Sequence, residues 1–365
     1  MLDKPPSLVW PRLLGLPSED VKIVYLDLCH WIYLAQASLG QPKGAKFVPS
    51  LEACRAARSA GTAVFVLSAI HYMEMLKIKD PAQRRSISNV MEELTDFATL
   101  VYRSVVMKLE VDSMLDPYAN RTSSLPNIPL IGRGIRHALG LRSGFKFTGP
   151  SGDETHPLKE QMGHKGFADF VEEINLGLER SVMRGPTDDE VGKLRVLGWN
   201  PEAATEGANT RAAAERALSD QLDAEDRWRR GRMRDLVAGR ELSMDFKKIL
   251  PQALKDRDLW CGDVISDRES ARAFVRGMPS TCVSIELKSA WHRNRDKKWT
   301  TNDVYDIEAM SLAVPYCDIV VTEKACHHAL VTADFGKRMH TALLRTLEDL
   351  PSVLAEWKPR RAPVE

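Results

Sequence analysis

Several features that often reveal a function at once are absent from this sequence. There is no Gly-rich phosphate loop and no Gly-x-Ser-x-Gly elbow, which argues against the nucleotide-binding and serine-hydrolase classes that depend on them. The six cysteines form no CxxC pair and no Cys/His finger spacing, and several of them lie inside apolar runs. We therefore expect neither a zinc site nor a disulfide framework, and the reducing cytosol is the default compartment.

Long apolar stretches and a strong net charge are absent as well. No stretch approaches the ~20 apolar residues that a membrane span requires. The first residues show no basic region followed by a continuous apolar core, so we expect no signal peptide. The formal net charge of +1 gives no global attraction to nucleic acid. We expect a soluble, cytoplasmic protein without membrane contact, whose binding of nucleic acid would depend on local basic segments.

What the sequence does contain is an alternation of strand and helix patterns in two separated parts. The chain has 365 residues, 44% of them hydrophobic and 28% charged, as in an ordinary globular protein. Residues 1–20 are rich in proline and are expected to be an irregular lead-in. Residues 21–110 and 278–365 have the pattern of an α/β core, whereas residues 111–277 are helical in pattern and highly charged. We predict an α/β core in two parts, interrupted by a large, mostly helical insertion.

Acids follow the first two predicted strands. Residues 21–28 (VKIVYLDL) predict a strand with Asp27 near its end, and residues 62–68 (TAVFVLS) predict a second strand. The helix predicted after that second strand carries Glu74. Acids at the carboxyl ends of buried parallel strands lie at the edge where open sheets bind ligands. A helix N-cap for Asp27 and a solvated helix face for Glu74 fit the pattern equally well.

A predicted helix from Asp303 to Val314 carries two more acids. At about 100° per residue, Asp303 and Asp306 fall on the same side as Ile307 and Met310. Unpaired acids on a buried face would cost several kcal/mol, and a bound divalent cation would offset that cost. A structural role in the first helical turn is an equal alternative for Asp303.

The apolar run after this helix predicts a buried strand. Residues 319–321 would form it, with Glu323 at the carboxyl end and Asp318 at the opposite end. We therefore expect Asp318 to be a structural acid or a partner of the basic insertion. A shorter strand would make Asp318, rather than Glu323, the last candidate ligand.

The candidate site is made of acids alone. Hard oxygen ligands without cysteine or clustered histidine suit Mg²⁺ or Mn²⁺. Such ions generate a hydroxide and stabilise charge on a phosphodiester. The five candidates are Asp27, Glu74, Asp303, Asp306 and Glu323.

The order of these acids resembles the PIN-like nuclease family. The likeness is carried by Asp27 after Val24-Tyr25-Leu26, Glu74 after the second strand, Asp303 and Asp306 on the helix, and the strand before Thr322-Glu323. It covers roughly residues 20–110 and 278–355, and the helical middle has no counterpart in compact members. The resemblance implies a Rossmann-like parallel sheet, Mg²⁺ or Mn²⁺ held by acids at its carboxyl edge, and cleavage of RNA, often by a bacterial toxin or defence effector. One departure is that Glu323 directly follows a threonine, whereas the family's last acid usually stands two residues after it.

Three basic segments are candidates for contact with a nucleic-acid backbone: residues 133–146, 227–234 and 288–298. The last overlaps WHRNRDKKW, in which cations could neutralise phosphates and aromatic rings could stack on unpaired bases. A solvated charged linker is an equal alternative. The candidates in this stretch are Trp291, Arg293, Arg295, Lys297, Lys298 and Trp299.

We therefore predict a metal-dependent endoribonuclease that hydrolyses RNA phosphodiester bonds. Asp27, Glu74, Asp303 and Asp306 would be catalytic and would hold the metal, and Glu323 would complete its shell. The sequence does not distinguish between tRNA and mRNA as the substrate. The insertion is a candidate binding site for a regulatory protein partner. One alternative is a DNA nuclease on the same fold, since the choice depends on contacts to the 2′-OH. The other is a catalytically silent nucleic-acid-binding or scaffold module.

Overall fold

A small parallel sheet forms the centre of the fold in the computed structural model. The structure describes residues 8–18, 20–119, 127–141, 146–150, 152–197, 200–229 and 231–358. Four strands are paired in the order β10-β9-β2-β3, all parallel. Their bounds are Lys22–Leu26 (β2), Ala63–Val66 (β3), Ile319–Val321 (β9) and Ala342–Leu344 (β10). The prediction of an α/β protein with a parallel sheet is confirmed at this level.

The order of the strands reverses at the middle of the sheet. From β2 the chain passes to β3 on one side, and it returns much later on the other side through β9 and then β10. The strand β4 (Ala98–Leu100) lies beyond β3, joined to its extension by a parallel bridge between Leu67 and Thr99. The reversal point is therefore between β2 and β9. In open α/β sheets, crevices that bind ligands lie outside the carboxyl ends of the strands at such a point.

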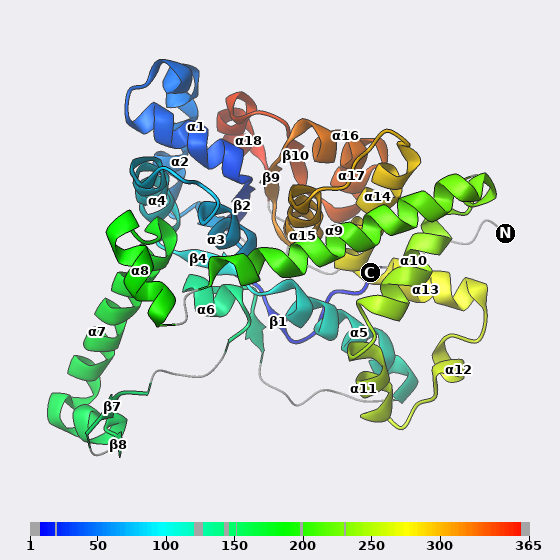
Figure 1. The fold of residues 1–365 in the computed structure, drawn as a ribbon, viewed down its shortest axis with the longest axis horizontal. Coiled ribbons are helices and arrows are strands. Elements are labelled where there is room, and N and C mark those ends of the chain that lie inside the picture. The colour runs from blue at the N-terminus through cyan, green and yellow to red at the C-terminus, as the bar shows by residue number, and fades with distance from the viewer. Residues whose placement is uncertain are drawn as a thin grey trace.

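Both faces of the sheet are covered, which explains why its strands are apolar runs. Along β2, Ile23 and Tyr25 face one hydrophobic core, and Val24 and Leu26 face another, as the alternation of a strand requires. The two sets of covering helices lie on opposite sides of the sheet in Figure 1. The first core includes α14 (Pro279–Arg293), α15 (Thr301–Tyr316), α16 (Lys324–Thr332) and α17 (Phe335–Met339); the second includes α1 (Leu28–Ser38), α2 (Val48–Ser59), α3 (Ala69–Met75), α4 (Pro81–Thr95) and α18 (Leu350–Glu356).

Residues 80–109 have the sequence pattern of one long helix, but the structure does not form one there. Asp96 and Phe97 adopt positive φ angles of 49° and 56°, which end α4 and turn the chain into β4. The next helix, α5 (Arg103–Ala119), then runs across the expected boundary at residue 110. The expected lead-in is not wholly irregular either. Its short strand β1 (Leu14–Gly15) pairs in parallel with β5 (Ile128–Pro129).

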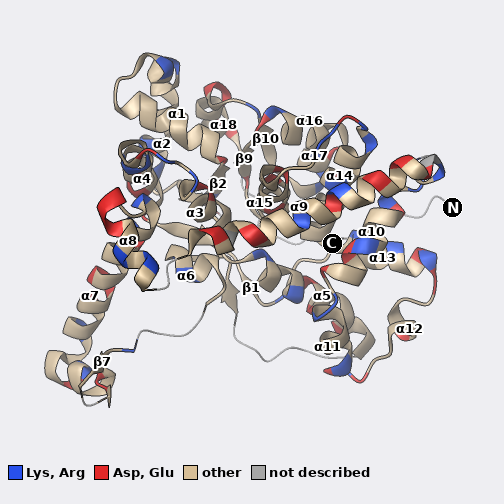
Figure 2. Ribbon diagram, viewed as in Figure 1, with Lys and Arg blue, Asp and Glu red and all other residues tan. Residues whose placement is uncertain are grey.

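The segment between the two parts of the core is mostly helical, as predicted. Helix α9 packs against α15 and crosses in front of it in Figure 1, whereas α7 extends away from the body, with β7 and β8 at its far end. Helices α8 and α9 carry charges of both signs (Figure 2). The elements here are β6 (Ile131–Arg133), α6 (Gly134–Ala138), β7 (Thr148–Gly149), β8 (Gly152–Asp153), α7 (Thr155–Arg184), α8 (Asp188–Val196), α9 (Pro201–Ala224), α10 (Met233–Met244), α11 (Ile249–Lys255), α12 (Cys261–Val264) and α13 (Arg268–Gly277). The described residues also form the 3-10 helices η1 (Pro42–Phe47), η2 (Asp226–Trp228) and η3 (Leu347–Asp349).

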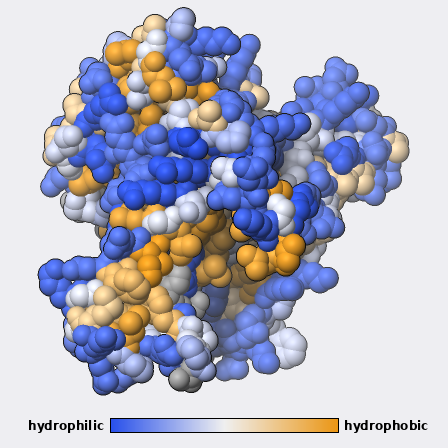
Figure 3. Space-filling model, turned by 60° about the vertical axis from the view of Figure 1, so that its left-hand side comes forward, coloured by the Kyte–Doolittle hydropathy of each residue, from blue (hydrophilic) through white to orange (hydrophobic). Residues whose placement is uncertain are grey.

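The surface is polar over most of the face in Figure 3, where apolar side chains gather in a hollow. Among the described residues, no helix combines the length and the apolar character needed to cross a membrane.

Candidate functional site

Asp27 lies at the reversal point of the sheet and is tied to the neighbouring strand. The Thr322 hydroxyl donates a hydrogen bond to Asp27 Oδ2 at 2.5 Å, and the Glu323 backbone N–H donates to the same oxygen at 3.2 Å. Asp27 occupies the residue before α1, yet its side chain makes no capping hydrogen bond to that helix. Asp27 is therefore the N-cap residue of α1 by position, but its side chain is bonded to the neighbouring strand and not to the helix. Glu323 holds the equivalent position before α16, also without a side-chain cap.

Two further acids reach this edge from the helices beside it. Glu74 lies on α3, which follows β3, and Asp306 lies on α15, which precedes β9. These two helices contact each other. Asp27, Glu74 and Asp306 are half-buried, while Glu323 is exposed. The structure thus brings together four of the five acids selected from the sequence.

Burial and mutual repulsion raise the pKa values of three of these carboxyl groups. Removal from water is the largest cause in each case, and it raises the pKa of Asp27 and of Glu74 to about 7 and that of Asp306 to about 8. The causes of these three pKa shifts also include charge repulsion, which acts between every pair of the four acids. The hydrogen bond from Thr322 opposes the increase at Asp27. The surroundings therefore do not fully balance the negative charge that the cluster would carry when all its acids are ionised.

One exposed cation stands beside the cluster. Lys77 follows α3, and its charge lowers the pKa of Glu74. Its Nζ donates to Asn302 Oδ1 at 2.9 Å and lies 4.0 Å from the centre of the Tyr305 ring. These contacts hold the ammonium group against the first turns of α15. The sequence analysis missed Lys77, because only the contact between α3 and α15 brings it to the site.

Asp303 makes the contacts expected of its structural alternative, in the first turn of α15. Its Oδ1 accepts hydrogen bonds from Trp291 Nε1 at 2.8 Å and Lys297 Nζ at 2.5 Å. Its Oδ2 accepts from the backbone N–H and the hydroxyl of Thr300, both at 2.7 Å. These bonds outweigh burial and lower the pKa of Asp303. Both oxygens are thus used to cap α15 and to hold the preceding segment, which favours the structural role of Asp303 over metal binding.

The burial of Trp291 and Trp299 contradicts their predicted stacking on bases. Their exposed fractions are 6% and 2%, and both belong to the core that covers the sheet. Lys297 is half-buried and bound to Asp303. Three of the predicted phosphate-binding residues, Arg293, Arg295 and Lys298, are exposed.

The other basic segments are partly engaged within the protein. In residues 227–234, Arg229 is largely buried and pairs with Asp223 at 2.6 Å, and residue 230 lies outside the described chain. In residues 133–146, Arg133 pairs with Asp96 at 2.7 Å, and residues 142–145 are likewise not described.

Asp318 is structural, as predicted. Its Oδ2 accepts the backbone N–H of Ile23 at 2.7 Å, and the residue is 3% exposed. This contact lies near the amino ends of β2 and β9, away from Asp27. Glu323 is therefore the better candidate for the last ligand.

The chemistry of the donor set fits a hard divalent cation, although the side chains do not enclose one. Among the residues that the structure describes, no three His, Cys, Asp or Glu side chains are arranged to hold a metal ion. Four oxygen-bearing acids that repel one another are nevertheless suited to Mg²⁺ or Mn²⁺, since a cation would offset the repulsion. Comparisons with protein families, with curated proteins and with solved structures gave no match for this chain.

Proposed function

We propose that this protein is a divalent-metal-dependent endoribonuclease, and that Asp27, Glu74, Asp306 and Glu323 hold the metal. One observation carries the proposal: four carboxylates from four separate elements meet where the strand order reverses, and every pair of them repels. Such a cluster reduces the stability of the fold, and clusters of this kind are characteristic of functional sites.

The surrounding residues would orient the acids for this role. Thr322 and the Glu323 N–H hold Oδ2 of Asp27, and no described residue donates a hydrogen bond to the other oxygen, Oδ1. A bound Mg²⁺ or Mn²⁺ would supply Lewis-acid chemistry, lowering the pKa of water and stabilising charge on a phosphodiester. Lys77 would contribute a positive charge beside the scissile phosphate.

The choice of RNA as substrate rests on the resemblance to PIN-like nucleases. Numbered by their order in the chain, β2, β3, β4, β9 and β10 would stand as 3-2-1-4-5, the order of a Rossmann-like sheet. The exposed Arg293, Arg295 and Lys298 supply cations for a phosphate backbone. A toxin or defence role, with a regulatory protein partner, is part of the same proposal.

The test is cleavage of a mixed pool of RNA, single-stranded DNA and double-stranded DNA with Mn²⁺. We expect discrete RNA fragments that disappear with chelator and in the Asp27→Asn/Asp306→Asn variant. The matched control, Asp220→Asn, changes an exposed acid on α9 and should cleave like the wild type. Products from DNA alone would identify a DNA nuclease. Absence of both cleavage and Mn²⁺ binding would favour a silent binding module.

A further inference from the structure

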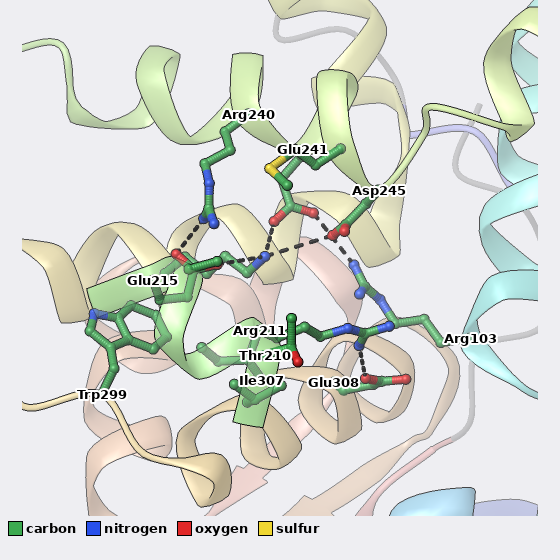
Figure 4. A pocket seen from close by; sticks show the side chains of 14 residues that line it. Arg103, Thr210, Arg211, Glu215, Arg240, Glu241, Asp245, Trp299, Ile307 and Glu308 are labelled. Carbon is green, nitrogen blue, oxygen red and sulfur yellow. Dashed lines mark hydrogen bonds and ion pairs between the residues drawn. The ribbon is translucent and has the colours of Figure 1, made fainter. Parts of the chain in front are cut away.

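A separate cavity of about 140 Å³ adjoins α15 on the side that packs against the insertion (Figure 4). Trp299, Val304 and Ile307 form an apolar wall of the cavity. Most of its charged side chains come from α9, α10 and α14, and Arg103 at the start of α5 and Glu308 on α15 add two more. Asp306 lies roughly opposite the cavity-lining Val304 and Glu308 around the axis of α15, since each helical residue advances by about 100°. The cavity is therefore distinct from the acidic cluster but shares a helix with it.

Two buried charged residues that line the cavity have polar atoms without hydrogen-bond partners. Arg103 is 7% exposed, and its Nε and Nη2 have no partner among the described residues. Glu241 is 2% exposed, and its Oε2 also has none. Arg103 Nη2 lies 3.9 Å from Glu241 Oε2, which is too far for a hydrogen bond. A buried donor and a buried acceptor thus lie next to each other without forming hydrogen bonds. A ligand that bonds to both would remove the free-energy cost of leaving them unsatisfied.

The charges in the cavity balance one another, so the ligand should bring no net charge. Arg211 binds Glu308 at 2.6 Å, Arg240 binds Glu215 at 2.5 Å, and Lys288 binds Oε1 of Glu241. Four cations face four acids: Arg103, Arg211, Arg240 and Lys288 against Glu215, Glu241, Asp245 and Glu308. A free phosphate or a divalent cation would disturb this balance. A neutral group that offers an acceptor next to an N–H donor would preserve it.

We propose that this cavity binds a guanine base. Its O6 and N7 accept hydrogen bonds from Arg103 Nη2 and Nε, which is the fork that arginine commonly presents to guanine. Its N1–H, next to O6, donates to Glu241 Oε2. Adenine offers a donor where guanine has O6 and an acceptor at N1, so it mismatches both partners.

The size and shape of the cavity suit a base rather than a whole nucleotide. A cavity of about 150 Å³ holds a single aromatic ring, and the fused rings of a base would extend toward the open side. Arg211 and Met244 are exposed and line the cavity, so the sugar and phosphate would lie near them outside. Flipped bases are recognised in this way, by their hydrogen-bonding edge and by an apolar wall.

Guanine in a free nucleotide and guanine in an RNA strand present the same edge. If the strand is the source, the inference rests on the proposed nuclease function and specifies guanine near the cleavage site. The test is therefore made without catalysis, in the Asp306→Asn protein with chelator present. Binding of guanosine, adenosine and inosine monophosphates is followed by calorimetry and by tryptophan fluorescence. UUGUU and UUAUU pentamers provide the RNA arm.

We expect guanosine monophosphate to bind at least tenfold more tightly than adenosine monophosphate. Inosine monophosphate should bind about as well as the guanosine compound, because it keeps O6, N1–H and N7. A preference of the protein for UUGUU would identify the strand as the source, and binding of the mononucleotide alone would identify a free nucleotide. Equal binding of guanine and adenine compounds, or binding of neither, would overturn the proposal.

Two alanines on α9 give a matched pair of variants. Ala214 lines the cavity, whereas its neighbour Ala213 is exposed and does not. Ala214→Leu should fill the cavity and reduce guanosine monophosphate binding at least tenfold, while Ala213→Leu should leave it unchanged. Both leucines preserve the helix propensity of α9, and melting curves verify that both variants fold. Binding that survives in Ala214→Leu would place the ligand elsewhere and contradict the inference.

Discussion

The Thr322 hydroxyl donates a 2.5 Å hydrogen bond to Asp27 Oδ2, joining the ends of two adjacent strands whose residues are 295 positions apart in the chain. This bond fixes one carboxylate oxygen at the reversal point of the sheet. It also lowers the pKa of Asp27 against the larger effect of burial. The first strand and the last part of the core are thus connected at the candidate site itself.

Replacing this hydroxyl should weaken metal binding more than folding. Thr322→Val removes the donor, so we expect the pKa of Asp27 to rise further. The Mn²⁺ affinity at pH 7 should fall about tenfold, because a charge-assisted hydrogen bond contributes roughly 1.4 kcal/mol, which is a factor of ten in affinity. Calorimetric titration with Mn²⁺ measures this. Thr341→Val is the control, because the buried Thr341 hydroxyl bonds Val314 O at 2.6 Å, away from the acids. Equal losses of Mn²⁺ affinity in both variants would contradict the prediction.

Without metal, Asp306 should make the protein less stable as the pH rises. Its pKa is raised from 3.8 to about 8 in the folded state, so the folded protein holds a proton that the unfolded chain releases above pH 4. The resulting stability is present at low pH and is lost as the pH rises from about 4 to about 8. Asn resembles the protonated acid, so Asp306→Asn should be more stable than the wild type at pH 8, by at most a few kcal/mol. The gain should be much smaller at pH 5, where only a part of the loss has occurred.

Thermal melts with chelator at pH 5 and pH 8 measure this difference. Added Mn²⁺ should stabilise the wild type at pH 8 and have a much smaller effect on Asp306→Asn, since a ligand that binds only the folded state raises its stability. The control Asp220→Asn should follow the wild type at both pH values. A gain in Asp306→Asn that is the same at pH 5 and pH 8 would show that its carboxylate is not the cause.

Asp303 and Asp306, one turn apart on the same helix, should respond in opposite ways. Asp303→Asn replaces an acceptor that has four donors, so we expect a loss of about 1–3 kcal/mol in the free energy of unfolding, measured by urea denaturation at pH 7. Mn²⁺ affinity per folded molecule should change less than in Asp306→Asn. A variant that stays stable but no longer binds Mn²⁺ would restore Asp303 as a ligand.

The elements of the core were predictable because their signals are local. The apolar runs before Asp27 and Glu323 are buried strands, and the segment with Glu74 is a helix that follows one. Each acid could therefore be placed relative to an element, and the parallel sheet brings these positions to one edge. The four acids that meet there were all among the candidates.

The remainder depends on contacts that no local pattern contains. The same spacing that selected Asp306 also selected Asp303, and only the fold of the preceding segment, with Trp291 and Lys297, separates a capping acid from a free one. The strand β4 has three residues inside a helical pattern and exists because of its pairing with β6. The cavity beside Arg103 requires the insertion to fold back on α15, which the sequence does not reveal.

Removal of Lys77 should have opposite effects on metal binding and on cleavage. Its charge stands beside Glu74 and Asp306, so Lys77→Met removes a cation that competes with the metal, and Mn²⁺ should bind a few-fold more tightly. Cleavage of RNA should nevertheless slow by about tenfold at saturating Mn²⁺, because a group that stabilises charge near the phosphate is lost. Lys79→Met, two residues further on and also exposed, is the matched control and should change neither property. If both variants bind Mn²⁺ and cleave RNA like the wild type, the role of Lys77 is structural only. Parallel losses of Mn²⁺ affinity and activity in Lys77→Met would indicate that Lys77 positions the acids instead.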